Sequence, residues 1–244
     1  MPPKEMFARY NEGDPVKLRE VAEYCIKDTL LPHRLLSKLC ILINLLEMAK
    51  ATWVPLCYLV ERGQQIKVFS LLTKKARETG YMVPSLPWGY SSDVGYEGAT
   101  VLEAQKGAYY TPITALDFEG LYPSIMMAHN LCYSTLVMDD RRYGNIPGIT
   151  YETFGDYKFA QDVPSLLPSI LLELKQFRKQ AKKDMAKSTG ALKEMYNVKQ
   201  LAYKVSMNSV YGFTGASKGM LPCVQMASTV TMKGRSMIDE TKEY

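Results

Sequence analysis

The chain has 244 residues, of which 47% are hydrophobic, and it carries a formal net charge of +5 at pH 7. This length allows a substantial hydrophobic core, while so modest a positive charge permits a polyanionic partner without identifying one. A membrane span needs roughly twenty uninterrupted apolar residues. The chain has no such stretch and no secretory signal, so we expect an intracellular protein with no membrane partner.

The five cysteines show neither the CxxC spacing nor the Cys/His grouping that would indicate a metal centre. Most of them lie in apolar runs, and His33 and His129 are isolated along the sequence. We therefore expect reduced cysteines in the core and no zinc or iron–sulfur site.

Helices are predicted for much of the first third of the chain. The spacing of apolar residues predicts helices over residues 16–31, 32–50 and 62–79. Pro32 is placed at the start of the second helix, because proline is tolerated in a first helical turn. This region therefore supplies helices rather than a sheet.

A loop and two strands are predicted next. Residues 86–98 are rich in Gly, Ser, Pro and Tyr, which predicts a loop. Residues 100–118 suggest two strands, the second buried and ending at Asp117. Residues 139–163 predict an insertion with a few short strands, and a further helix is expected to begin near Ala227.

The sequence DFEGLYPSI, which begins at Asp117, suits phosphate chemistry. A carboxylate at the end of a strand can reach into a cleft and hold magnesium against phosphate oxygens. In the following turn, the backbone amides of Gly120 and Leu121 are placed to point at a phosphate. Most Asp residues after a strand are only turn or helix-capping residues, so this motif alone does not decide the function.

A second motif, KVSMNSVYG, begins at Lys204. Lys204, Asn208 and Tyr211 follow at i, i+4 and i+7, so a helix presents a cation, an amide and a phenol along one stripe. Such a stripe opposite a metal-binding carboxylate suits a metal-loaded triphosphate. The second motif therefore favours a functional role for Asp117.

A helix predicted over residues 166–187 precedes this motif and carries Arg178 and Lys182 at i and i+4. A turn at residues 188–190 would fold the two helices into an antiparallel hairpin. Arginine can bind phosphate through two N–H groups and lysine acts as a point charge, so the hairpin would clamp a triphosphate. Other lysines on this helix are more simply explained as a solvated face: Lys175, Lys179, Lys183 and Lys187.

Together the two motifs resemble motifs A and B of family B DNA polymerases. The resemblance covers nearly the whole chain from about Val21 onward, and the patterns DFxxLYPSI and KxxxNSxYGF at this spacing are specific. The sequences RGQQIKV, SIMMAHNLCY and YGFTGA are similar to the delta type. Gly120, where cellular delta polymerases usually have Ser, and the run YGNIPGI resemble the delta-like replicative polymerases of large double-stranded DNA viruses, particularly those of algae.

The resemblance implies roles for individual residues. Asp117 would bind both catalytic magnesium ions, with the Phe118 carbonyl as an added ligand. Tyr122 would be the steric gate, its ring under the sugar, so that a ribonucleotide 2′-OH clashes; its alternative is an ordinary core aromatic. The other nucleotide contacts would come from the amides of Gly120 and Leu121, the cations Arg178, Lys182 and Lys204, the amide of Asn208, and Tyr211 near the nascent base pair.

Tyr24 and Asp28 lie at i and i+4 on a predicted helix, a pair too common to identify a function alone. Their position ahead of the polymerase motifs resembles the third exonuclease motif of family B proofreading domains. The resemblance implies that Asp28 binds metal and Tyr24 orients the attacking water. The other two exonuclease motifs and the third polymerase motif, with its second essential carboxylate, are not in the sequence, so we expect an internal fragment. Glu119 is expected to point away from Asp117 along an extended segment.

The resemblance implies an α/β multidomain fold of the α+β kind. Residues 1–45 would form the C-terminal part of a 3′–5′ exonuclease domain and residues 46–98 a helical connection. Residues 99–164 would form the palm, with motif A, an antiparallel sheet and an insertion. Residues 165–215 would form antiparallel two-helix fingers with motif B, and residues 216–244 would return to the palm and stop before motif C.

The implied reaction is template-directed DNA synthesis in replication, in which a primer 3′-hydroxyl receives a nucleotide from a dNTP and pyrophosphate leaves. The full-length protein would also proofread in the 3′–5′ direction, whereas the fragment alone would be inactive. The cofactors would be two Mg²⁺ ions, with Mn²⁺ as a substitute. The partners would be primer–template DNA, dNTP, a sliding clamp and accessory replication subunits, in the nucleus or a viral replication factory.

Two alternatives stay open at this point. One is a catalytically inactive polymerase-like subunit that binds nucleic acid or takes part in assembly. The other is a chromosomal delta polymerase of a cell rather than of a virus. An Asp-x-Asp hairpin in the sequence downstream would favour the enzyme over the inactive subunit.

Overall fold

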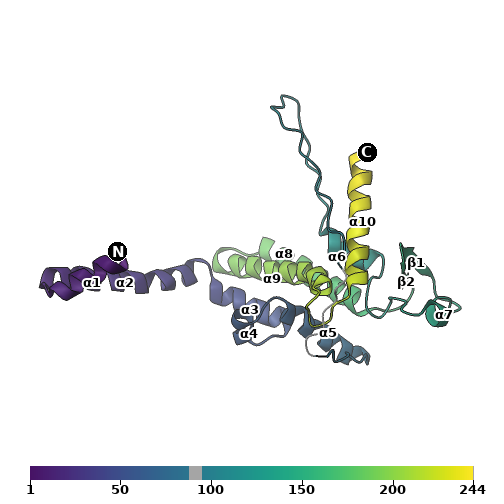
Figure 1. The fold of residues 1–244 in the computed structure, drawn as a ribbon, viewed down its shortest axis with the longest axis horizontal. Coiled ribbons are helices and arrows are strands. Elements are labelled where there is room, and N and C mark those ends of the chain that lie inside the picture. The colour runs from purple at the N-terminus through teal and green to yellow at the C-terminus, as the bar shows by residue number, and fades with distance from the viewer. Residues whose placement is uncertain (88–94, 244) are drawn as a thin grey trace. The chain divides into compact units, whose positions relative to one another are not determined.

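The computed structural model describes residues 1–87 and 95–243, so the middle of the predicted loop 86–98 lies outside the described residues. The chain divides into two compact units, Met1–Leu46 and Glu47–Tyr244. The described part combines many helices with a small antiparallel sheet, which confirms the predicted mixed fold class (Figure 1).

The first unit is helical and begins with α1 (Pro3–Glu12) and α2 (Pro15–Lys38). Gly13 ends α1 in the left-handed conformation at φ +67°, which glycine adopts without steric cost. Asp14 then caps α2, because its carboxylate accepts a hydrogen bond of 3.0 Å from the backbone N–H of Val16. The two helices follow directly on one another through this short connection.

The predicted helix boundary at Pro32 is wrong, because Pro32 lies inside α2. An internal proline removes one backbone hydrogen bond and costs about 3 kcal/mol, but the leucines, lysines and arginine around it favour the helix. The chain leaves the helix instead at Cys40, whose φ of +50° is left-handed. The next helix, α3 (Ile41–Thr52), starts from there.

The second unit is built around five helices that share one core. They are α5 (Gln65–Thr79), α6 (Leu121–Ala128), α8 (Leu166–Ala186), α9 (Gly190–Gly215) and α10 (Val224–Glu243). Two short helices, α4 (Leu56–Glu61) and α7 (Asp140–Tyr143), complete the order. The core side chains include Val68, Leu72, Ile125, Met126, Phe159, Leu167, Leu171, Val210, Phe213, Met226 and Val230.

Helices α8 and α9 form the predicted antiparallel hairpin, with the turn where it was expected (Figure 1). Along α8, buried apolar side chains recur at helical spacing: Leu167, Ile170, Leu171 and Leu174. This stripe packs into the core, so the adjacent face of α8 is left for polar and charged residues. Lys75 of α5 pairs with Glu173 of α8 at the edge of this packing.

The sheet has two strands, β1 (Tyr151–Phe154) and β2 (Tyr157–Ala160), paired antiparallel with Tyr151 opposite Ala160. It lies within the insertion at residues 139–163, where short strands were predicted. Phe154 and Phe159 are buried, so one face of this hairpin joins the core of the unit.

The two strands predicted over residues 100–118 are wrong. This segment carries no strand assignment, and its backbone makes no hydrogen bond to any other segment among the described residues. A strand is stabilised by a ladder of backbone hydrogen bonds to a neighbouring strand, and among the described residues this segment has no such ladder. Its apolar residues are correspondingly uncovered, with Ile113 70% and Leu116 76% exposed, so the predicted burial is wrong too.

Asn130 follows α6, and its side chain forms hydrogen bonds to the insertion and to the start of α8. Its backbone is left-handed at φ +49°, and its Nδ2 lies 3.0, 3.0 and 2.9 Å from the carbonyl oxygens of Ala160, Gln161 and Val163. Its Oδ1 accepts a hydrogen bond from Ser165, the residue before α8. One side chain thus fixes the base of the α8–α9 hairpin relative to α6.

Within the described residues, no single helix is both long enough and apolar enough to cross a membrane. Helices α2 and α3 meet that test only when taken as one bent pair.

Candidate functional site

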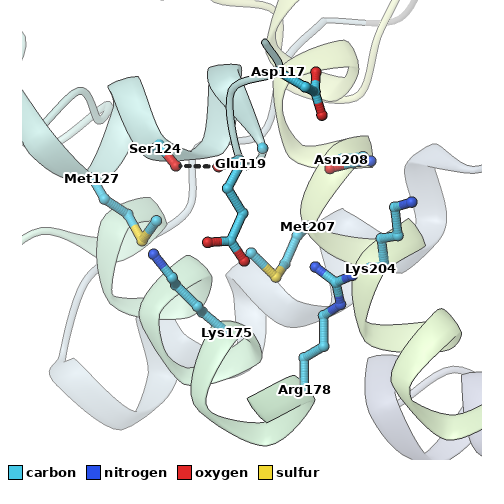
Figure 2. Close-up of a pocket in the computed structure, with 10 residues that line it drawn as sticks. Asp117, Glu119, Ser124, Met127, Lys175, Arg178, Lys204, Met207 and Asn208 are labelled. Carbon is cyan, nitrogen blue, oxygen red and sulfur yellow. Dashed lines mark hydrogen bonds between the residues drawn. The ribbon is translucent and has the colours of Figure 1, made fainter. Parts of the chain in front are cut away.

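A pocket of about 230 Å³ opens between the segment that enters α6 and the α8–α9 hairpin (Figure 2). It combines two carboxylates, three cations, an amide and a helix start in one hollow. The lining residues are Asp117, Glu119, Gly120, Ser124, Met127, Lys175, Arg178, Lys204, Met207 and Asn208.

The acidic side of the pocket comes from the turn into α6. Gly120 precedes the helix with φ +61°, a left-handed conformation that turns the chain sharply. The Oγ of Ser124 donates a hydrogen bond of 2.9 Å to the carbonyl of Glu119, which holds the turn in place. The first amides of α6 have no partner within the helix, so this end favours an anion.

The basic side comes from the hairpin. Lys175 and Arg178 lie on α8 three residues apart, and Lys204 and Asn208 lie on α9 four residues apart, so each pair shares a face. The Nε of Arg178 donates a hydrogen bond of 3.3 Å to the Oε1 of the buried Gln200 on α9. This bond helps to orient the guanidinium across the hairpin.

The cations of the pocket are not neutralised by direct ion pairs. Within residues 1–87 and 95–243, neither Lys175, Arg178 nor Lys204 belongs to an ion pair. Their charge therefore remains available to a ligand, and three positive charges stand against two negative ones in the lining. Such a pocket suits an anion that brings its own cation.

Several predicted site residues meet in this pocket, and others do not. Asp117, Gly120, Arg178, Lys204 and Asn208 line it together, although they come from three separate elements. Lys182 is exposed one turn further along α8 and is not in the lining.

Phe118 lies on another side of the same turn, where it lines a hollow beside Met237 of α10. Leu121 lines that same hollow and is not in the lining of the pocket that holds Asp117. The roles assigned to these two residues concern their backbone carbonyl and amide groups, and those roles stay predictions.

Tyr122 and Tyr211 pack against one another and are not in the lining of this pocket. Their ring centroids are 4.4 Å apart, with the planes tilted by 44°. The hydroxyl of Tyr211 lies 3.0 Å from that of Tyr96, and burial together with this contact raises the pKa of Tyr211. On the other side, a Cβ on Gly234 of α10 would lie 3.3 Å from the Tyr122 ring, so the missing side chain makes room for it.

Sequence reasoning missed two charged residues of the pocket, Glu119 and Lys175. Lys175 was assigned to a solvated face, yet it lines the pocket; its spacing of three residues from Arg178 was the signal that could have found it. Glu119 was expected to point away from Asp117, and that expectation is wrong, because both line the same pocket. In an extended segment, residues two apart lie on the same face, so the alternation itself places Glu119 on the side of Asp117.

Tyr24 and Asp28 lie together on α2, in the first compact unit. The nearby carboxylate of Asp28 raises the pKa of Tyr24, because it favours the protonated phenol. Within the described residues there is no group of three or more His, Cys, Asp or Glu side chains that could hold a metal ion. Their proposed exonuclease role is therefore a prediction that rests on the sequence motif.

A turn that offers a carboxylate and free amides, facing a basic helical hairpin, is the arrangement predicted from motifs A and B. The family model for DNA polymerase family B matches residues 54–244. The chain therefore belongs to DNA polymerase family B, which confirms the predicted family.

Its sequence is similar to viral and cellular members alike. It is 46% identical over 255 residues to a DNA polymerase of Paramecium bursaria Chlorella virus NY2A, covering 99% of this chain and 28% of the relative. It is 48% identical over 231 residues to the DNA polymerase delta catalytic subunit of Candida albicans, covering 92% of this chain and 22% of the relative. The chain thus spans about a quarter of the length of these relatives.

The fold is also found in a solved structure. The family B DNA polymerase from the hyperthermophilic archaeon Pyrobaculum calidifontis matches with a TM-score of 0.80 and 24% identity, covering 100% of this chain and 31% of that one. At this identity the comparison shows a common fold. The sequence relatives thus include both a viral DNA polymerase and a cellular delta catalytic subunit.

Proposed function

We propose that this chain is part of a DNA-directed DNA polymerase that extends a primer by nucleotidyl transfer from a dNTP. The observation that carries the proposal is the pocket itself, which Asp117, Arg178 and Lys204 line together with Gly120 at the start of α6. Phosphoryl transfer depends on positioning and charge neutralisation, and these groups supply both.

The pocket fits a metal-loaded triphosphate. Magnesium is usually held by one or two carboxylates together with substrate phosphates and water, and Asp117 is a carboxylate placed beside the phosphate-binding cations. Asp117, with the Phe118 carbonyl as an added ligand, would hold two Mg²⁺ ions, or Mn²⁺ in their place. The metal would neutralise and orient the phosphate oxygens.

The remaining contacts follow from the same placement. Arg178, Lys204 and the amides of Gly120 and Leu121 would bind the phosphates, with Lys182 joining from the next turn of α8. Asn208 would hold the incoming nucleotide, Tyr211 would lie near the nascent base pair, and Tyr122 would act as the gate against the ribose 2′-OH. The packing of Tyr122 on Tyr211 supports a shared role near the sugar and base.

In this proposal the segments take the places of a family B polymerase. Residues 1–45 end a 3′–5′ exonuclease domain, in which Tyr24 and Asp28 would serve proofreading, and residues 46–98 connect it to the rest. Residues 99–164 and 216–244 belong to the palm, and residues 165–215 form the fingers. Primer–template DNA and dNTP would be the substrates, and a sliding clamp and accessory subunits the partners, in a nucleus or viral replication factory.

The test is Asp117→Ala in the full-length protein. Primer extension should fall by more than about a hundredfold while primer–template affinity stays nearly unchanged, because a metal ligand acts mainly in the transition state. The matched control is Asp156→Ala, which removes an exposed acid in the β1–β2 turn. Extension within tenfold of wild type would reject Asp117 as a ligand, and a wild-type protein that binds DNA without extending it would favour the inactive subunit.

A further inference from the structure

Glu119 places a second negative charge in the pocket, beside the phosphate-binding cations. Figure 2 shows its side chain extending into the hollow toward Lys175, whereas Asp117 lies on the side of Asn208. Its carbonyl is held by the hydroxyl of Ser124, so the residue is anchored at its backbone while its carboxylate projects inward. The two acids therefore occupy different parts of one pocket.

The carboxylate of Glu119 is not committed to a partner. Within the described part of the chain it forms no ion pair, and neither do Lys175, Arg178 and Lys204 around the same hollow. A direct ion pair would have cancelled one cation and left the others to a ligand. An unpaired acid instead lowers the positive potential of the whole pocket.

A phosphate chain bound by these cations would lie near this acid, because Glu119 lines the same hollow. A triphosphate without metal, and pyrophosphate without metal, meet both Asp117 and Glu119 as like charges. A triphosphate that carries a divalent cation has part of its charge neutralised, and the cation itself is attracted to the acids. The acid thus acts differently on the two forms of the same ligand.

We propose that Glu119 makes nucleotide binding depend on the bound divalent cation, by weakening the binding of metal-free triphosphate and of pyrophosphate. This inference rests on the proposed function, since it assigns a selectivity to the same pocket. Glu119 is here a specificity-determining residue, which excludes the unloaded nucleotide and favours the departure of the product. Asp117 keeps the metal-binding role.

The test compares wild type with Glu119→Gln in the full-length protein, bound to a primer–template whose primer end cannot be extended. Dissociation constants are measured for dNTP with EDTA, for pyrophosphate with EDTA, and for dNTP with Mg²⁺. The variant should bind the two metal-free ligands about tenfold more tightly, the factor for a unit charge roughly 6 Å away at an effective dielectric constant of roughly 40. Binding of the magnesium-loaded dNTP should change by less than about threefold.

The matched control is Glu194→Gln, which removes the same charge from an exposed position of α9 outside the pocket. It should leave all three constants unchanged. Unchanged metal-free binding in Glu119→Gln would overturn the inference. A fall of more than about a hundredfold in magnesium-dependent extension would overturn it as well, because Glu119 would then be a metal ligand.

The two proposals fail separately. If the wild-type protein extends no primer, the proposed polymerase function fails. The metal-free dissociation constants still decide the role of Glu119 in that case, because they require no turnover.

Discussion

Tyr122 is held on two sides by residues far away in the sequence. Its ring packs on Tyr211 of α9, and the absence of a side chain at Gly234 of α10 leaves space for its edge. The aromatic pair is half-buried rather than part of the closed core. A ring fixed in this way can exclude a group by shape, because it cannot move aside without disturbing two helices.

Replacing this ring gives a residue-scale prediction. Tyr122→Ala should admit ribonucleotides, with the ratio of rNTP to dNTP incorporation rising by at least about tenfold as the steric clash with the 2′-OH is removed. The measurement is single-nucleotide incorporation by the full-length protein with matched rNTP and dNTP. Tyr110→Ala, at a tyrosine that is 97% exposed, is the control. Unchanged sugar selectivity in Tyr122→Ala would show that another residue is the gate.

At the scale of elements, the pocket depends on how α6 and the α8–α9 hairpin are held together. The acids come with α6 and the cations with the hairpin, so a shift between them would open or close the pocket. Asn130 bridges these parts through its contacts to Ala160, Gln161, Val163 and Ser165. Its left-handed backbone is a conformation that asparagine tolerates better than most residues.

Asn130→Ala should therefore destabilise the protein markedly. The change removes the donor to three backbone carbonyls and leaves alanine at positive φ, and we expect the free energy of unfolding to fall by about 2–4 kcal/mol. Urea denaturation followed by circular dichroism measures it. The control is Asn197→Ala on α9, where the amide only spans neighbouring side chains of its own helix. If the two variants had the same free energy of unfolding, the contacts of Asn130 would not stabilise the protein as proposed.

At the scale of the whole molecule, the chain spans about a quarter of the length of its relatives. Asp117 and Glu119 are the acids of the pocket, and within the described residues no cluster of three or more metal-ligating side chains is present. Two-metal catalysis needs carboxylates that clamp both ions. Tyr24 and Asp28, the two residues proposed for an exonuclease site, form a pair on one helix.

The purified 244-residue chain should accordingly show neither primer extension nor degradation of single-stranded DNA in the presence of magnesium. Weak, salt-sensitive binding of DNA or nucleotide is the most that its modest positive charge supports. Labelled primer–template and single-stranded substrates test both activities in gel assays. Template-dependent extension that disappears in Asp117→Ala would contradict this expectation and show that the chain holds a complete site.

The sequence by itself determined the family, the α8–α9 hairpin with its turn, and the stripe of Lys204, Asn208 and Tyr211. These features follow from local spacing, since the period of a helix decides which residues share a face. The sequence also predicted that Asp117 and Arg178 belong to one site, and both residues line the same pocket. The predicted helix boundary at Pro32 was wrong, because the helix propensity of the surrounding residues outweighed the cost of an internal proline.

Only the tertiary structure decided the remaining points. Residues 100–118 have strand-like sequence but no strand, because a strand exists through its partner and the described residues offer none. Glu119 and Lys175 share one pocket because α6 and α8 pack against one another. Local spacing could not place a carboxylate opposite a lysine more than fifty positions away, since that distance is closed by the burial of a core shared among five helices.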